Sequence, residues 1–363
     1  MKRTWLPIAV LALALVLSPV SAFAIDYVTQ RGVEKPIGGA IKTISRTEVV
    51  VFQTVGSKEI KIPSNEVVAV EWGGEPGEFG LGRDDESNGN LVKALERFTA
   101  AADEAKGASA NIKADIDFFI ARTAAKMAIA DPAQADVAFT KLKAFVTVQR
   151  DNFRFFEAQA LLAEVALRTN QAPVADSAFN SLTTAPWSDT KMAGQIGLAR
   201  VLLAGKNVAG AKTGFDAVVA LPATTPAETA RHLQAMLGQA RCMQMQMQHP
   251  EALVVLEQVV EKADADETRT LAEAYLLQGD SLLALAKDDK DDKKKDAVLA
   301  YLHVDVIPSL AAESDLHAEA LFRLAKLWGP IGQPARGEEA SGKLQQLYPK
   351  SEWIKQLAGG TGG

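Results

Sequence analysis

The hydrophobic pattern of the chain changes its period near residue 90. Between residues 26 and 75, short runs rich in β-branched residues alternate with glycine pairs, serines and a Pro-Ser-Asn turn. Runs of this kind, bounded by turn residues, predict strands. They cover residues 41–44, 49–52, 60–62 and 67–72. We therefore expect a small all-β domain over residues 25–75, barrel-like so that the sheet protects its own edges.

A glycine-rich stretch ends the strand pattern, and residues 76–90 are predicted to be a linker. From Leu91 onward the apolar spacing is helical, and one signature recurs at intervals of 36 to 45 residues. In each copy a small residue is followed four positions later by a large one, on the same face of a helix. The copies are Ala94/Phe98, Ala135/Phe139, Ala175/Phe179, Ala211/Phe215, Ala252/Leu256, Ala297/Tyr301 and Ala340/Leu344.

A second series of small residues lies between these copies, each inside an apolar helical segment. Its members are Ala121, Ala163, Ala199, Ala240, Gly279 and Ala325. The two series alternate strictly, which indicates helix–turn–helix units stacked in a row. Helices approach closely where one presents a small residue and the other fills the gap with a bulky one, so neighbouring units bury a continuous core. We predict a mainly α protein, a right-handed α-solenoid of about six helix pairs over residues 91–355.

Two segments resemble the tetratricopeptide repeat (TPR). Residues 275–282, YLLQGDSL, are similar to the first helix of such a repeat, and residues 347–353, LYPKSEW, are similar to its end. The resemblance covers roughly residues 91–355, although these units are longer than the usual repeat of about 34 residues. It implies a concave face, formed by the first helix of each pair, that binds peptides or partner helices. By strand spacing alone, residues 25–75 resemble SH3-like or Sm-like barrels.

The two ends of the chain are expected to lie outside the fold. Lys2 and Arg3 precede an uncharged apolar run, and residues 22–24, Ala-Phe-Ala, have the small-x-small pattern of a cleavage site. This is the pattern of a signal peptide over residues 1–24, so we expect a periplasmic or secreted protein. No later run is long and apolar enough for a membrane span. The glycine-rich tail over residues 356–363 is predicted to be disordered.

Charge and cysteine content exclude some classes of function. The formal net charge is −6, which argues against nucleic acid as a partner because nucleic-acid binding needs a basic surface. Cys242 is the single cysteine, so no disulfide framework is possible within the chain.

The resemblance places a set of charged residues on the concave face. They are the residues that follow each small marker of the first helices: Arg122, Glu164, Arg200, Arg241, Asp280 and Lys326. One interpretation is that the basic members hold carboxylates of an acidic or C-terminal peptide, since the guanidinium of arginine meets a carboxylate with two hydrogen bonds. The alternative is a solvated helix surface, which is charged in any protein of this kind.

Residues 242–249, CMQMQMQH, gather ligands that suit Cu(I). On a helix only Met243 and Met247 would share a face, and methionine also fills gaps in helical cores, so we predict no metal site here. No catalytic motif is present, because the four histidines are scattered and form no His-Glu-x-x-His pair.

These observations predict a scaffold rather than an enzyme. We expect a non-enzymatic protein-binding adaptor of the cell envelope, without cofactors, that takes partner peptides or helices in the concave groove. The alternatives are a structural subunit that self-associates within an envelope assembly and, on the Met-rich segment alone, a carrier of metal or small ligands.

Overall fold

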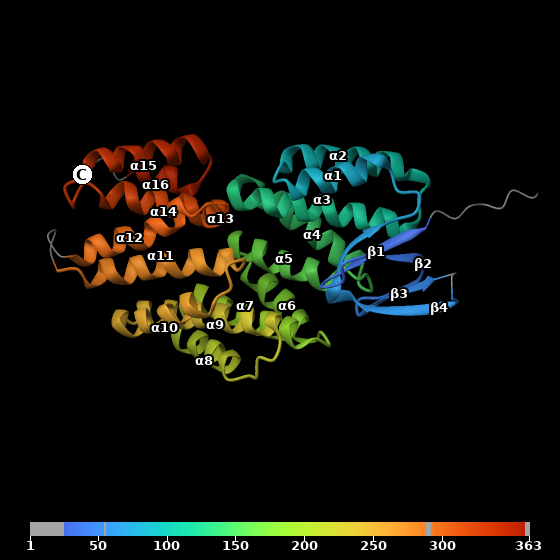
Figure 1. Ribbon diagram of the computed structural model, residues 1–363, viewed down its shortest axis with the longest axis horizontal. Helices are drawn as coiled ribbons and strands as arrows, with labels where there is room; N and C mark the ends of the chain where they lie inside the picture. Colours follow the sequence, from blue (N-terminus) through green and yellow to red (C-terminus); the bar gives the residue numbers. More distant parts are fainter. Residues whose placement is uncertain (1–24, 54–55, 288–291, 360–363) are drawn as a thin grey trace, which may run out of the picture.

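The computed structural model describes residues 25–53, 56–287 and 292–359. The strands are β1 (Asp26–Gln30), β2 (Ile37–Ile44), β3 (Glu48–Gln53), β4 (Lys58–Pro63) and β5 (Val67–Glu71). The helices are α1 (Gly77–Ser87), α2 (Leu91–Glu104), α3 (Ala110–Ala130), α4 (Ala135–Val148), α5 (Phe155–Arg168), α6 (Ala172–Thr183), α7 (Ser188–Ala204), α8 (Val208–Val219), α9 (Pro226–Met245), α10 (His249–Lys262), α11 (Thr268–Leu285), α12 (Asp292–Val306), α13 (Pro308–Ala311), α14 (Ser314–Leu327), α15 (Pro334–Leu347) and α16 (Glu352–Gly359) (Figure 1). The predicted signal peptide over residues 1–24 lies outside the described residues.

The N-terminal strands form one antiparallel sheet in the order β4-β3-β2-β1-β5. Val28 of β1 lies opposite Val70 of β5, and Val49 of β3 lies opposite Ile62 of β4; all four side chains are buried. Irregular register in β1 and β2 adds curvature to the sheet. The prediction of a small β domain before the helices is confirmed. Within the described residues β4 and β5 are the two edges of the sheet.

Residues 77–87, predicted as part of a linker, form helix α1 instead. Phe79 is fully buried, and a Cβ atom added at Gly82 would lie 2.5 Å from the ring of Phe98 on α2. The glycines of this stretch therefore allow two helices to touch. The prediction was wrong because glycine was interpreted as a turn residue, whereas here it is the small partner in a helix contact.

The helical part is a row of stacked pairs, as the repeat pattern predicted. Markers of the first series lie on α2, α4, α6, α8, α10, α12 and α15, and those of the second series lie on α3, α5, α7, α9, α11 and α14. The close contact is direct at Gly279 on α11, where an added Cβ would lie 2.3 Å from the ring of Tyr301 on α12. Pro173, Pro250 and Pro334 stand in the first turn of α6, α10 and α15, where proline costs no helical hydrogen bond.

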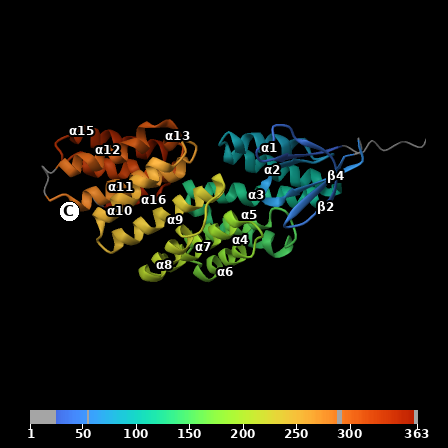
Figure 2. The same cartoon turned by 60° about the horizontal axis from the view of Figure 1, so that its bottom comes forward.

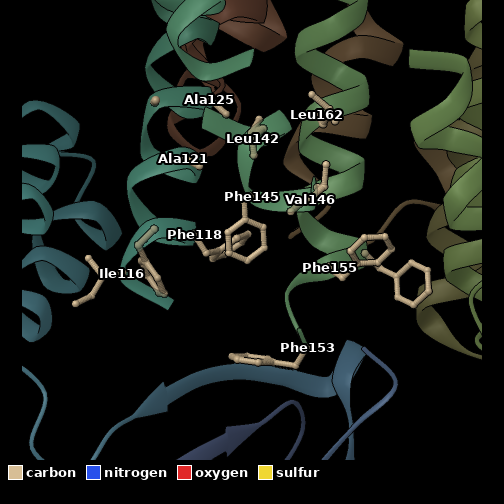
Figure 3. Close-up of a cluster of buried hydrophobic side chains, with 14 of the residues drawn as sticks. Ile116, Phe118, Ala121, Ala125, Leu142, Phe145, Val146, Phe153, Phe155 and Leu162 are labelled. Atoms are coloured by element: carbon tan, nitrogen blue, oxygen red, sulfur yellow. The ribbon is translucent and has the colours of Figure 1, made fainter. Parts of the chain in front are cut away.

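The sheet and the first helix pairs share one hydrophobic core. A continuous cluster of buried side chains runs from Val28 in the sheet to Ala185 in the loop before α7. Phe118 of α3 meets Phe145 of α4 at 5.5 Å between ring centroids, and Phe153 extends from the loop before α5 over the sheet (Figure 3). Its ring lies 6.5 Å from that of Trp72. The β domain is thus fixed to the solenoid.

Helix α16 closes the C-terminal end of the row. Trp353, Ile354 and Leu357 pack against the cluster of buried residues formed by α11 to α15. The prediction of a disordered tail from residue 356 is therefore wrong as far as Gly359, because apolar side chains bind this turn to the core; residues 360–363 lie outside the described residues. None of the described helices is long and apolar enough to cross a membrane.

The row of helices curves back on itself. The first pairs, the middle pairs around α7 to α10 and the last pairs occupy three sides, and the last pairs return beside the end of α3 (Figures 1 and 2). Contacts between α3 and α14 confirm that these distant segments meet. The concave side of this curve is the candidate functional site.

Candidate functional site: the concave face of the solenoid

The first helix of each pair faces the inside of the curve. One hollow on this side is lined by residues of α3, α5, α9, α11 and α14 and of the segments that follow α3 and α15. Helices that are neighbours only through several intervening pairs converge there, as expected for the inner helices of a superhelix. The projection of the concave face onto the first helices therefore agrees with the structure.

Two predicted residues, Glu164 of α5 and Arg200 of α7, bind each other. The guanidinium of Arg200 donates to both carboxylate oxygens of Glu164, with 2.9 Å between Nη2 and Oε2. The charge of Glu164 raises the pKa of Arg200 above its usual value. Both side chains are close to half exposed, at 45% for Arg200 and 41% for Glu164. The pair bridges two successive first helices on the concave surface.

Arg241 of α9 also binds a carboxylate of a neighbouring first helix, in this case the following one. Its Nε and Nη2 atoms donate to Oε1 of Glu273 on α11, at 2.9 and 2.7 Å. Burial alone would raise the pKa of Glu273, but the cations of Arg241 and Arg200 outweigh burial and hold this pKa below its usual range. Glu273 thus joins the two arginines electrostatically.

Asp280 of α11 has partners on two further helices. It accepts a hydrogen bond of 2.7 Å from the hydroxyl of Tyr301 on α12, and one of 3.3 Å from Nη2 of Arg323 on α14. The same Nη2 atom donates to Glu319 at 3.0 Å. Burial raises the pKa of Glu319, and the nearby Arg323 only partly opposes that rise.

The remaining two predicted residues lie apart from this group. Arg122 of α3 binds Glu86 of α1 and also Glu157 of α5, the latter at 3.4 Å, so it belongs to the N-terminal pairs. Lys326 of α14 is exposed, and its ammonium group lies 4.6 Å from the centre of the Phe322 ring. The structure therefore brings together Glu164, Arg200, Arg241 and Asp280 and leaves out Arg122 and Lys326.

These contacts bear on the interpretation that the arginines hold a partner's carboxylates. Arg122, Arg200 and Arg241 each already hold a carboxylate of this chain. An acidic peptide would have to displace Glu86, Glu164 or Glu273 to reach them. The carboxylates that pair with the arginines lie 32 to 36 residues away in the sequence, about one repeat. Glu164 was among the predicted residues, but its pairing with Arg200 was not predicted, and Glu86 and Glu273 were missed.

A hollow of about 380 Å³ opens on the concave face toward the C-terminal half of the solenoid. Leu203, Leu276 and Leu277 supply apolar walls, and its polar lining includes Arg323 and His249. Nε of Arg323 and both ring nitrogens of His249 are buried without a hydrogen-bond partner among the described residues. Buried polar atoms in proteins nearly always have a partner, so this hollow is a candidate binding pocket.

The Met-rich segment that suggested copper does not gather its ligands. Cys242 is fully buried, Met243 packs against the core, and Met247 is 77% exposed in a left-handed backbone conformation beyond the end of α9. Met243 and Met247 therefore do not share a helical face as the sequence suggested. Among residues 25–53, 56–287 and 292–359, no group of three or more His, Cys, Asp or Glu side chains is placed to hold a metal ion.

Two buried polar clusters escaped sequence analysis. Arg154, only 2% exposed, pairs with the fully buried Asp115 at 3.2 Å in the core between the sheet and the solenoid. Near the C-terminus His317 lies between Asp305, 3.0 Å from its Nε2, and the hydroxyl of Tyr348, 2.7 Å from its Nδ1. These side chains come from separate elements, and nothing in their local sequence distinguishes them from surface residues.

Comparison with known proteins supports the fold. A scan against protein-family models and a search of curated proteins each found no match. Among solved structures, a tetratricopeptide repeat protein from Parabacteroides merdae is 15% identical with a TM-score of 0.50, over 77% of this chain and 95% of that protein. The apo form of RapI is 12% identical with a TM-score of 0.53, over 77% of this chain and 98% of RapI. The helical part of this chain is thus a TPR-like solenoid.

Proposed function

We propose that the protein is a non-enzymatic scaffold that binds a protein partner in the concave groove of the solenoid. The observation that carries the proposal is the hollow of about 380 Å³ on this face, with apolar walls and buried polar atoms that lack partners. TPR-like solenoids are suited to this role because stacked repeats create an extended concave surface.

The chemistry of the hollow indicates which part of a partner it takes. Leu203, Leu276 and Leu277 suit an apolar side chain. The unpartnered donor at Nε of Arg323 needs an acceptor, and a main-chain carbonyl of a peptide supplies one without adding charge. Asp280 and Glu319 line the same hollow together with Arg241 and Arg323, so its fixed charges balance and do not favour a carboxylate. We therefore propose an apolar anchor residue within a peptide or helix, in place of the acidic peptide first considered.

The setting that we propose is the cell envelope, with export directed by residues 1–24. This rests on the sequence pattern of a signal peptide. The mass of the protein recovered from the envelope fraction tests it, because cleavage after Ala24 leaves Ile25 as the first residue. We also retain the proposal of an SH3-like or Sm-like sheet, which the register irregularities in β1 and β2 support because small barrels need such curvature.

Two neighbouring leucines on α7 allow a matched test of the groove. Leu203 lines the hollow, whereas Leu202 is 39% exposed and does not line it. The mature chain, Leu203→Glu and Leu202→Glu are each used to capture partners from the native envelope fraction. We expect Leu203→Glu to lose partners that the other two retain. Capture of the same partners by all three proteins would contradict binding in this hollow.

Self-association is the alternative function that the sequence left open. Helix α16 covers the last core with Trp353, Ile354 and Leu357, as a terminal cap does. The molecular mass measured over a wide range of protein concentration separates the two functions, because a scaffold of single chains keeps a constant mass and a self-associating subunit gains mass.

A further inference from the structure

The curved row of helices brings together residues that are far apart in the sequence. Nη2 of Arg168, in the last turn of α5, lies 3.2 Å from Oδ2 of Asp315, in the first turn of α14. Nζ of Lys350, between α15 and α16, lies 3.0 Å from Oδ2 of Asp131, which follows α3. These pairs span 147 and 219 residues. We call this contact between the first and last pairs the seam, and its two ion pairs the latch.

Each partner of the Arg168–Asp315 pair is placed favourably in its own helix. A cation in the last turn of α5 and an anion in the first turn of α14 both complement the helix dipoles. Asp315 also receives two hydrogen bonds from Arg269 of α11, at 2.9 and 2.8 Å, which fix it on the C-terminal side of the seam. Burial favours a higher pKa for Asp315, but the hydrogen bond and charge of Arg269, with Arg168, lower it. Asp315 is therefore ionised and can pair with Arg168.

The seam has no shared hydrophobic core among the described residues. The buried cluster of the first pairs ends before α7, and the buried cluster of the last pairs begins on α11. Between them lies a hollow of about 230 Å³, whose lining includes Ile129 and Pro132 on one side and Trp353 on the other. The two ion pairs are therefore the specific contacts across the seam, and water can solvate their charged groups when they separate.

Exposure of the latch residues keeps this contact weak. The side chain of Lys350 is 71% exposed and that of Arg168 is 38% exposed. Ion pairs with exposed partners contribute little to stability and are screened by salt. Each helix pair of a solenoid is stabilised by its neighbours in the row, so the seam between the first and last pairs can separate without unfolding any pair.

We propose that the solenoid opens and closes reversibly at the seam, and that the latch holds the closed form. Closure brings α14 against α3 and so narrows the entrance to the concave face. The open form is the one that admits a partner to the groove, an inference that rests on the proposed function. The partner then competes with the latch. Charge changes at the seam should therefore alter access to the groove without touching the groove itself.

The distance across the seam tests the proposal in the absence of any partner, so that failure here leaves the proposed function to be judged by its own experiment. Spin labels are attached to the mature chain at Asp136→Cys on α4 and Lys355→Cys on α16, both exposed positions on opposite sides of the seam. Native Cys242 is fully buried and escapes labelling. Electron–electron dipolar spectroscopy then gives the distribution of distances between the labels.

Reversal of one charge should open the seam, and reversal of both should close it again. We expect Lys350→Glu to shift the distribution to longer distances and Lys350→Glu with Asp131→Lys to restore it. Lys262→Glu, at an exposed position of α10, should leave it unchanged. An increase of salt from about 0.05 M to about 1 M should lengthen the distances in the unaltered chain, because the Debye length falls severalfold. One distribution shared by all variants and both salt concentrations would overturn the proposal.

Discussion

The indole Nε1 of Trp72, at the end of the sheet, donates a hydrogen bond of 2.9 Å to Oδ2 of Asp115 on α3. The other oxygen of Asp115 accepts from Nε of Arg154 at 3.2 Å. Arg154 also donates to the main-chain oxygen of Val68 in β5, at 3.4 Å. One buried carboxylate thus connects the β domain, α3 and the loop before α5.

Removal of this carboxylate should unfold the protein more readily than any change at the surface. Asp115→Ala removes the buried partner of Arg154 and leaves its guanidinium only Glu157, which is 43% exposed; breaking a buried ion pair costs about 3–5 kcal/mol in similar cases. We expect a loss of that size in the free energy of unfolding, measured by urea denaturation. Asp103→Ala, at an exposed aspartate of α2, is the control and should change stability little. Equal stabilities would show that Asp115 is not needed to neutralise Arg154.

Substitution by alanine should change stability in opposite directions at two glycines, one packed against an aromatic ring and one facing open space. A Cβ atom at Gly238 of α9 would lie 2.4 Å from the ring of Phe215, so Gly238→Ala must displace helix α8 or the ring. We expect a loss of about 1–3 kcal/mol, as for overpacked cores. Gly342 of α15 has nothing within 4 Å of an added Cβ, so Gly342→Ala should gain about 0.5–1 kcal/mol. Thermal denaturation measures both, and a similar loss for both would contradict the packing argument.

Acid should weaken the contact between α1 and α3 through Glu86. Burial opposes ionisation of Glu86, but hydrogen bonds and charge from Arg122, with Lys126, lower its pKa below the usual 4.5. A carboxyl whose pKa is lower in the folded state adds stability above its unfolded pKa and loses it as pH falls through the folded value. The free energy of unfolding should therefore fall as pH decreases below about 4.5.

The pH profile of Glu86→Gln provides the check. The variant cannot titrate at this position, so its stability should depend less on pH below about 4.5 than that of the unaltered chain. Glu96→Gln, at an exposed glutamate of α2, is the matched control and should keep the original slope. Profiles of equal slope for Glu86→Gln and the unaltered chain would show that Glu86 is not stabilised by the fold.

The helix pairs could be predicted from the sequence, whereas the contacts between helices and between charged side chains could not. Large markers such as Phe215 and small markers such as Ala240 alternate at regular intervals along the chain. This pattern can be found in the sequence alone, so it predicted which helices pair. In contrast, Gly82 could not be assigned to a helix contact. Only its contact with Phe98, which the three-dimensional structure shows, distinguishes a packed glycine from a turn glycine. Helical phase named Glu164, Arg200, Arg241 and Asp280, which the structure brings together, and also Arg122 and Lys326, which lie apart. Their pairing was not predictable, since it depends on the rotation between successive pairs.

The Arg200–Glu164 pair allows a final test of how the concave face recognises its partner. Arg200→Glu places two carboxylates together, and we expect capture of partners from the envelope fraction to fall. The double variant Arg200→Glu with Glu164→Arg restores an ion pair in reversed order. If the pair only shapes the groove, as its internal hydrogen bonds indicate, capture should return. If Arg200 instead holds a carboxylate of the partner, the double variant should stay inactive, and the acidic-peptide interpretation would replace the apolar-anchor proposal.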